Sequence, residues 1–331
     1  MTTMRAVVYD GAGDASVVHV RDEPRPEPAM GQVRVRVRAS ALNRADLLQR
    51  AGRYPPPPGA PAHIPGLEYA GEIDALGCDE GPFAVGDRVF GLADGGAHAE
   101  FVCVPWAHCA RIPARLDFAE AGAVPEAFIT AHDAMVTQGG LAAGGRVIIT
   151  ACGSGVGTAG VQLAHAIGAL AFGTSRTAGK LERARDLGLS GGVVLAGDPV
   201  PLVDAVRTWS GGAGADVAMD LLGGMYASAC LQAMALRGRV IVVGLLAGAE
   251  IPLSLGWLLS RRLTIRGTVL RSRSVSEKAS ATDAFVRDVV PLLASGAVRP
   301  VVHAQFAFDD VRKAHAAMEG GEPFGKLVLT W

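Results

Sequence analysis

The residues best suited to chemistry form a glycine-rich turn near the middle of the chain. Residues 146–164 read RVIITACGSGVGTAGVQLA, with the turn at Gly153, Ser154, Gly155, Val156 and Gly157 and a further glycine at Gly160. Glycines allow a sharp turn that approaches a pyrophosphate closely, and the first N–H groups of a following helix attract its negative charge. The run is a variant of Gly-x-Gly-x-x-Gly, weak by itself, and the roles of its glycines cannot be separated in sequence. A plain strand-to-helix turn is the alternative, but an apolar strand before it and a helix after it favour dinucleotide binding.

The residues after the next strand indicate which dinucleotide is bound. An NAD site would usually carry Asp or Glu there, about 20 residues on, to hold the ribose hydroxyls. Here Ser175 and Arg176 follow the strand, with Lys180 one turn later. A hydroxyl and two cations suit a 2′-phosphate instead, although a solvated helix entry is the alternative for the two cations. We therefore expect NADPH as the cofactor.

Short β-rich runs alternate with helical stretches through residues 125–268. The β-rich runs are Arg146–Thr150, Leu170–Thr174, Val193–Leu195, Asp216–Asp220, Arg239–Val243 and Leu263–Thr268, and the helical stretches are Val156–Ile167, Lys180–Leu187, Pro201–Trp209 and Tyr226–Leu236. Parallel strands joined by right-handed helical crossovers form a doubly wound sheet. The sequence therefore predicts an α/β fold with a Rossmann-type dinucleotide-binding domain over 125–268.

Residues 1–124 have a different texture, in which short β-like runs are separated by Gly- and Pro-rich segments. Val33 to Arg38 reads V-R-V-R-V-R, and this two-residue period predicts a half-buried strand with valines on one face and arginines on the other. These features indicate a mainly β domain.

The end of the chain is expected to return to that first domain. A helical stretch at Ser276–Ala294 leads to a β tail at Lys326–Trp331, and six strands already complete the parallel sheet. The predicted division is therefore one domain from 1–124 and 269–331, and a second from 125–268.

Length and composition narrow the class of protein. The 331 residues exceed what one hydrophobic core usually supports, which indicates two domains. Half of the residues are hydrophobic and the formal net charge is −1, so the chain is globular and offers no electrostatic footprint for nucleic acid. Apolar runs such as Val240–Leu246 are too short to cross a bilayer, and the first residues do not read as a signal peptide. We expect a cytoplasmic protein, without a membrane partner, that binds a small molecule.

The cysteines and histidines give no sign of catalysis. Five scattered cysteines are typical of reduced, buried thiols rather than of a disulfide framework. The spacing contains no Ser-His-Asp or Cys-His pattern, and the eight histidines form no cluster in the sequence. We therefore expect each histidine to lie at the surface or in the core.

Several motifs taken together resemble the medium-chain dehydrogenase/reductase superfamily, and within it the zeta-crystallin-like quinone oxidoreductase branch. They span nearly the whole chain and are SALNRADLLQRAGRYPPPPG (Ser40–Gly59), PGLEYAGEI (Pro65–Ile73), VGDRVFGL (Val85–Leu92), PEAFITA (Pro125–Ala131), GSGVGTAGVQLA (Gly153–Ala164), VLRSRS (Val269–Ser274) and GKLVL (Gly325–Leu329). The resemblance implies a GroES-like catalytic domain, assembled from both chain ends, around the Rossmann domain.

The same resemblance implies an enzyme without zinc. Zinc-dependent relatives would place a cysteine ligand at Asn43 and a histidine ligand at Leu67, so both ligands are missing, and Glu68 becomes a structural or polar-network carboxylate. Without a Lewis acid to stabilise an alkoxide, alcohol oxidation is a poor candidate reaction. A quinone or an activated enone needs less electrophilic help.

The resemblance also implies which side chains border the reaction. Tyr54, Asn43 and Ser154 are the polar groups expected near nicotinamide and acceptor, and their alternatives are a loop anchor, a helix or turn cap and a turn residue. Further implied cofactor contacts are Asn43, Thr130, Gly244, Leu245, Leu270, Arg271, Ser272 and Lys326. One departure is Leu195, where many relatives have a tyrosine near the adenosine phosphate, and Arg176 is expected to compensate.

The expected function is therefore metal-free transfer of hydride or electrons from NADPH to a quinone. An NADPH-dependent enone or 2-alkenal double-bond reductase and a non-catalytic NADPH-binding protein remain as alternatives. The resemblance further suggests a homodimer formed by pairing sheet edges of the cofactor domains, with which the apolar run Val240–Leu246 is compatible.

Overall fold

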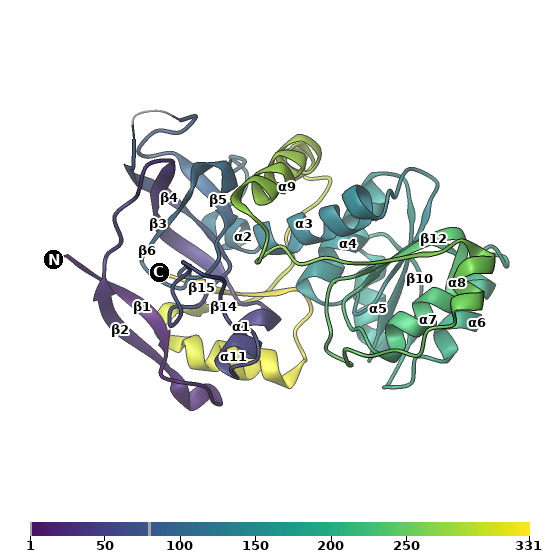
Figure 1. The fold of residues 1–331 in the computed structure, drawn as a ribbon. Coiled ribbons are helices and arrows are strands. Elements are labelled where there is room, and N and C mark those ends of the chain that lie inside the picture. Colours follow the sequence, from purple (N-terminus) through teal and green to yellow (C-terminus); the bar gives the residue numbers. More distant parts are fainter. Residues whose placement is uncertain (1, 79–80) are drawn as a thin grey trace. The chain divides into compact units, whose positions relative to one another are not determined.

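The computed structural model describes residues 2–78 and 81–331, so Met1 and residues 79–80 of the expected first domain lie outside the described part. The chain forms two compact units (Figure 1). Unit 1 consists of Met1–Ile129, Leu270–Ala294 and Pro300–Trp331, and unit 2 consists of Thr130–Val269 and Ser295–Arg299. Among the described helices, none combines the length and the apolar character that a membrane span requires.

Unit 2 is built on a six-stranded parallel sheet in the order β10-β9-β8-β11-β12-β13. Its strands are β8 (Arg146–Ile149), β9 (Leu170–Ser175), β10 (Leu189–Val194), β11 (Ala215–Asp220), β12 (Met234–Val242) and β13 (Thr264–Gly267). Its helices are α4 (Gly155–Ala166), α5 (Ala178–Arg185), α6 (Pro201–Trp209), α7 (Met225–Ala233) and α8 (Leu255–Arg261). The chain starts in the middle of the sheet, builds one side and then the other, which confirms the predicted doubly wound α/β fold.

Two element boundaries in unit 2 differ by three residues or more from those predicted. Tyr226–Leu236 has helical composition, but α7 ends at Ala233 and β12 already begins at Met234. The reason is tertiary pairing, because Met234 lies opposite Ala215 of β11 and this ladder outweighs local preference. The third strand begins at Leu189 rather than Val193, since the residues from Leu189 onward pair with β9.

Unit 1 contains a seven-stranded, mostly antiparallel sheet and a separate two-stranded hairpin. The hairpin strands are β1 (Thr3–Tyr9) and β2 (Val18–Pro24), and the sheet strands are β3 (Gln32–Ala41), β4 (Glu68–Leu76), β5 (Arg88–Leu92), β6 (Phe101–Pro105), β7 (Cys109–Arg111), β14 (Val302–Ala307) and β15 (Lys326–Thr330). The helices are α1 (Arg44–Arg50), α2 (Phe118–Gly122), α3 (Pro125–His132, which runs into unit 2), α9 (Val275–Asp288), α10 (Val290–Ser295) and α11 (Val311–Gly320). Short helical turns of unit 1 lie at Ala15–Val17, Trp106–His108 and Phe308–Asp310, whereas the π-helical turn at Asp133–Gln138 belongs to unit 2.

The V-R-V-R-V-R segment forms the predicted strand as part of β3, and all three valines are buried. The arginine face is less exposed than the alternation implied, because Arg34 is only 6% exposed. Its guanidinium forms ion pairs with Asp74 of β4 and with Glu27. A buried arginine is tolerated here because its charge is paired.

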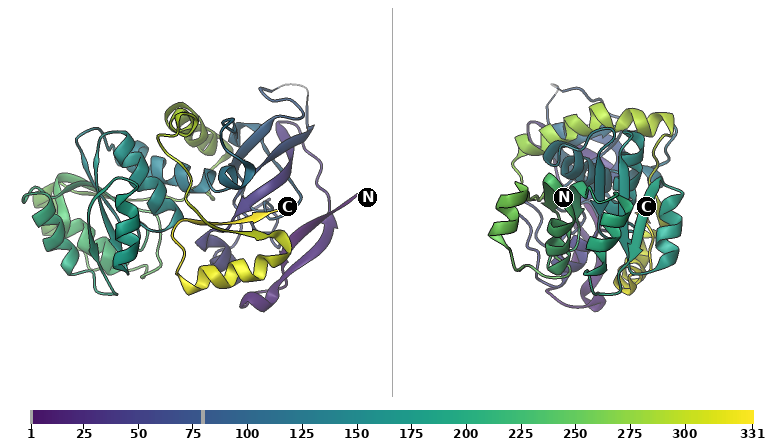
Figure 2. Two further views of the ribbon diagram at one scale, coloured as in Figure 1. Left: turned by 180° about the vertical axis from the view of Figure 1, so that it is seen from behind. Right: turned by 90° about the vertical axis from the view of Figure 1, so that its right-hand side faces the viewer.

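The last part of the chain completes unit 1, as β15 pairs with β3 and with β14. Figure 2 shows α11 beside the β1–β2 hairpin, and Val311 and Ala314 of this helix share a core with Val7 and Val18. The helical stretch predicted at Ser276–Ala294 is two helices, α9 and α10, separated at Val289. Pro291 accounts for the break, since it cannot donate a helical hydrogen bond and restricts the residue before it.

Candidate functional site

Unit 2 brings its glycine turn to the point where the strand order reverses, between β8 and β11. The two strand ends are tied together, because the Thr150 hydroxyl donates to Asp220 Oδ1 at 2.9 Å and accepts from the Leu221 N–H at 2.7 Å. Burial raises the pKa of the Asp220 carboxyl. Doubly wound sheets bind their ligands at this place, outside the carboxyl ends of the strands.

The geometry of the turn separates the roles of two glycines. A Cβ on Gly157 would lie 2.4 Å from the carbonyl oxygen of Ala151, and one on Gly160 would lie 2.7 Å from Cε of Met219. These glycines therefore let α4 approach the turn and the sheet closely. Ser154 is the N-cap of α4, and its hydroxyl accepts from the Gly157 N–H at 3.1 Å. A tight turn that ends in the N-terminus of a 12-residue helix fits a dinucleotide pyrophosphate.

The end of β9 carries the polar residues expected for a 2′-phosphate. Ser175 is buried, and its hydroxyl accepts from the Thr177 N–H at 3.3 Å. Arg176 is exposed, and Lys180 lies in the first turn of α5. Leu195, which replaces an expected tyrosine, is buried in the core of unit 2. Burial raises the pKa of Tyr226, and the Arg176 charge lowers it, so a tyrosine of α7 lies near this arginine.

The other cofactor contacts implied for unit 2 occupy different surroundings. Gly244 follows β12, and its N–H donates to the Asp220 carbonyl at 3.2 Å, which places it at the same sheet edge as the turn. Leu245 beside it is 57% exposed, whereas Thr130 on α3 is buried.

In unit 1, three polar side chains expected from separate motifs form one buried cluster. Glu68 at the start of β4 is fully buried, and its Oε1 forms an ion pair with Lys326 Nζ at 2.6 Å and accepts from Asn43 Nδ2 at 2.9 Å. Lys326 also donates to Asn43 Oδ1 at 2.6 Å and to the Leu42 carbonyl at 3.1 Å. The ammonium thus has one ion pair and two hydrogen bonds within this cluster.

Asn43 precedes α1 and joins that helix to the cluster. Its backbone N–H donates to Asp46 Oδ2 at 2.7 Å, as expected of the N-cap residue of α1. The Asn43 side chain is at the same time hydrogen-bonded to Glu68 and Lys326. The alternative of a helix cap is therefore confirmed for Asn43, and its role as a site residue stays a prediction.

This cluster does not fit a zinc ion. A catalytic zinc needs three protein ligands, but the position of one expected ligand is held by an amide, and Leu67 at the second has no donor atom. The remaining carboxylate is already bonded to an ammonium at Oε1 and to the Glu126 N–H at Oε2, 2.9 Å away. In residues 2–78 and 81–331, no group of three or more His, Cys, Asp or Glu side chains is arranged to hold a metal.

A small hollow in unit 1 lies beside this cluster. It is lined by Leu67, Leu92, Ala93, Asp94, Glu126, Leu270, Arg271 and Lys278. The Arg271 guanidinium donates from Nε to the Asp94 carbonyl at 2.8 Å and from Nη2 to Gln49 Oε1 at 2.7 Å. Its Cζ lies over the Tyr54 ring, 5.2 Å from the ring centroid. Burial, and then the Glu126 charge, raise the pKa of Tyr54. Tyr54, Leu270 and Arg271 are thus brought together, with Ser272 exposed next in the chain.

Glu126 is one of three charged residues of this hollow that were not predicted from the sequence, with Asp94 and Lys278. It is the second residue of α3, and burial followed by the Glu68 charge raises the pKa of its carboxyl to about 8. The signal was present, because PEAFITA places a carboxylate at the start of a helix after an apolar run. Its proximity to Glu68, 58 residues earlier, could not be read from the chain.

His98 and His315 are fully buried, which agrees with the expectation that the histidines lie at the surface or in the core. Ser40, His98 and Asp46 meet in the core of unit 1, with Ser40 Oγ 2.8 Å from His98 Nδ1 and His98 Nε2 3.7 Å from Asp46 Oδ2. Burial lowers the pKa of His315, also near Asp46, to about 4. The spacing missed this arrangement because β3, α1 and two distant segments supply it. All three members are fully buried, so they form a core network out of reach of a substrate.

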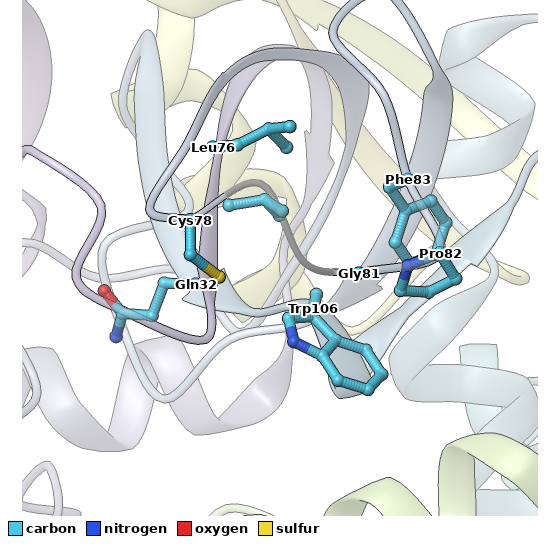
Figure 3. A pocket seen from close by; sticks show the side chains of 8 residues that line it. Gln32, Leu76, Cys78, Gly81, Pro82, Phe83 and Trp106 are labelled. Atoms are coloured by element: carbon cyan, nitrogen blue, oxygen red, sulfur yellow. The ribbon is translucent and has the colours of Figure 1, made fainter.

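The cysteines and a second hollow offer no comparable chemistry. Burial raises the pKa values of Cys103, Cys109 and Cys152 to about 12. Figure 3 shows the second hollow, also in unit 1, around Cys78 and Trp106. Its lining residues are Gln32, Val33, Leu76, Cys78, Gly81, Pro82, Phe83 and Trp106, and none of them is charged.

Comparison with protein families gives two matches. Residues 29–114 match the alcohol dehydrogenase GroES-like domain, and residues 155–286 match the zinc-binding dehydrogenase family. The first match lies in unit 1 and supports the GroES-like fold expected there.

Individual relatives cover the whole chain. Human quinone oxidoreductase is 29% identical over 98% of this chain and 97% of its own length. A solved NAD-dependent alcohol dehydrogenase is 31% identical, with a TM-score of 0.84 over 99% of this chain and 100% of its own. The mycobacterial protein Rv1454c, solved in complex with NADPH, is 25% identical, with a TM-score of 0.86 over 99% of this chain and 100% of its own.

Proposed function

Because the chain belongs to the medium-chain dehydrogenase/reductase superfamily of oxidoreductases, we propose that it reduces quinones with NADPH and without a metal. The observation that carries this proposal is the buried Lys326 ammonium bonded to Glu68 and Asn43. This set of groups cannot act as a Lewis acid, so the acceptor must itself be electrophilic. A quinone meets that requirement, and the likeness to human quinone oxidoreductase supports the choice.

Bound NADPH would supply the hydride. In unit 2, the N-terminus of α4 at Gly153–Gly157 would hold the pyrophosphate, and Ser175, Arg176 and Lys180 would bind the 2′-phosphate. The likeness to Rv1454c with NADPH supports this assignment, whereas the likeness to an NAD-dependent enzyme makes the preference a quantity to measure.

The remaining site residues are proposed to position cofactor and acceptor. Tyr54, Asn43 and Ser154 would border the reacting groups, with Asn43 held in place by Glu68 and Lys326. The further proposed cofactor contacts are Thr130, Gly244, Leu245, Leu270, Arg271, Ser272 and Lys326.

The test is cofactor oxidation against a panel of acceptors. Purified protein is mixed with NADPH or NADH and with ortho- and para-quinones, enones, 2-alkenals or simple aldehydes, and the cofactor absorbance is followed. We expect quinone-dependent oxidation of NADPH, and elemental analysis of the same sample is expected to find no stoichiometric zinc. Oxidation with 2-alkenals in preference to quinones would replace the proposal by a double-bond reductase. Binding of NADPH without oxidation by any acceptor would leave a cofactor-binding protein.

We further propose that two copies associate through the edge of the unit 2 sheet. Strand β13 is at that edge and its four residues are exposed. Exposed leucines on or near α8, namely Leu253, Leu255 and Leu259, extend the apolar surface of this unit. An edge strand has unpaired backbone groups that a second copy can bond in a symmetric dimer.

A further inference from the structure

Two polar groups of the hollow beside Glu68 lack partners. Arg271 is only 6% exposed, and its Nη1 is buried without a hydrogen bond in the described part of the chain. The Glu126 side chain is partly exposed, and no described residue forms a hydrogen bond or ion pair with its carboxyl. A buried donor without a partner is costly, which indicates that another molecule provides one.

The other residues that line the hollow leave Arg271 Nη1 and the Glu126 carboxyl available to a bound molecule. Lys278 and Asp94 form an ion pair with each other. The rest of the wall is apolar and consists of Leu67, Leu92, Ala93 and Leu270. The hollow has room for a group about the size of one water molecule, which is enough for a single oxygen atom and too little for a ring.

We propose that this hollow takes one carbonyl oxygen of the electron acceptor, with Arg271 Nη1 as its hydrogen-bond donor and the Glu126 carboxyl as its proton donor. The inference rests on the proposed quinone reductase function and adds to it a catalytic acid.

The step balances in atoms and electrons. The hydride from NADPH would bond to the far carbonyl oxygen of a para-quinone, and the π electrons of the ring would shift onto the carbonyl oxygen held in the hollow. The O–H bond of Glu126 breaks as the O–H bond of the reduced acceptor forms, so hydride plus proton convert the quinone to a hydroquinone. The Glu126 carboxylate then regains a proton from water. Arg271 keeps its charge and stabilises the oxygen while negative charge develops on it.

The surroundings of Glu126 keep its carboxyl protonated near neutral pH. Burial and the charges of Glu68 and Asp46 favour the neutral acid, while Lys326 and Arg271 oppose it, and the pKa is about 8. Tyr54 also faces this carboxyl, and Asp94 and Lys278 share the hollow with it. An acid with a pKa of about 8 loses its proton as the pH rises through that value, so the reaction should slow above about pH 8.

The first test is the pH dependence of kcat/KM with a para-quinone at saturating NADPH. The wild-type value should fall above about pH 8, and E126Q should be slower by about 10²- to 10⁴-fold and lack that fall. E126D keeps an acid and should recover part of the rate together with the pH dependence. The matched control is E322Q, which alters an exposed carboxylate and should behave as wild type. A wild-type rate and profile in E126Q would overturn the proposal and leave the hollow as a water site.

A second measurement does not depend on turnover. Infrared difference spectra of wild type minus E126Q should contain the carbonyl stretch of a protonated carboxylic acid at pH 7 and lose it above about pH 8. If the band is absent at pH 7, Glu126 is ionised and the inference fails, even for an active quinone reductase. If the band is present but the wild type reduces no quinone or enone, the proposed function fails and Glu126 is only a buried acid.

Discussion

At the scale of single residues, the site is governed by how buried charges are compensated. Glu68 is fully buried, so both of its carboxylate oxygens are removed from water. The ion pair with Lys326 and the hydrogen bonds from Asn43 and the Glu126 N–H compensate for this lost hydration. Lys326 is therefore fixed as tightly as Glu68, because either charge alone would be stranded in the core. This pairing holds Asn43 in a single orientation at the start of α1.

The basic side chain after β9 carries a prediction about the cofactor. If Arg176 binds the 2′-phosphate, Arg176→Ala should raise the Kd for NADPH about tenfold or more and leave the Kd for NADH nearly unchanged, because NADH has no such phosphate. Fluorescence titration with each cofactor measures both constants. Arg185→Ala removes an exposed arginine from the far end of α5 and serves as the control. An Arg176→Ala protein that still prefers NADPH as strongly as wild type would rule out this role.

Sequence reasoning anticipated some of these residues and could not anticipate others. The residue types at positions 43 and 67, Asn and Leu instead of the zinc ligands Cys and His, could be read from the sequence because each is a single position inside a recognisable motif. The raised pKa of Glu126 could not be predicted from the sequence, because it depends on packing against Glu68 and on the charge of Lys326, which lies 200 residues further along the chain. The same is true of His98 and Asp46, whose approach depends on the path of β3 and α1.

At the scale of elements, the turn before α4 depends on a close backbone approach. Gly157→Ala would place a methyl group 2.4 Å from the Ala151 carbonyl oxygen, so α4 must move away from the turn. We expect unfolding free energy to fall by about 1–3 kcal/mol, as overpacking usually costs, and NADPH binding to weaken about tenfold or more. Urea unfolding and cofactor titration measure the two effects.

The matched control is Gly256→Ala in α8, where a Cβ meets nothing closer than 3.9 Å. Alanine is the better helix former, so this variant should be unchanged or more stable by about 0.5–1 kcal/mol. Equal effects of the two substitutions would show that the turn has no special requirement for glycine.

Elements were predictable where pattern and packing agree. The strands at Arg146–Ile149 and the helix at Pro201–Trp209 follow the expected periods closely. The start of β12 was not predictable, because Met234–Leu236 has helical composition and becomes a strand only by pairing with β11. The burial of Arg34 could not be predicted either, because the alternation of valine and arginine does not show that Asp74 lies on the neighbouring strand.

At the scale of the whole molecule, the doubly wound sheet and the interrupted first unit follow from the order of elements alone. Strands and helices that alternate over 125–268 leave few topologies besides the one observed. The return of the C-terminal tail to the first domain was inferred because the parallel sheet was already complete, and in the structure β15 pairs there with β3. The local sequence does not indicate which edge of the sheet would contact a second copy of the chain.

The edge strand β13 gives the prediction at this scale. If two copies pair β13 with β13, Ile265 of each copy lies near the symmetry axis, and Ile265→Lys brings two positive charges together there. Sedimentation velocity should then find wild type near twice the 34.0 kDa of one chain and the variant near 34.0 kDa. Leu170→Lys alters a somewhat more exposed apolar residue on the interior strand β9 and should remain dimeric. A wild-type monomer, or an Ile265→Lys protein that stays dimeric, would exclude this edge as the interface, whereas loss of the dimer in Ile265→Lys alone would place the interface at β13.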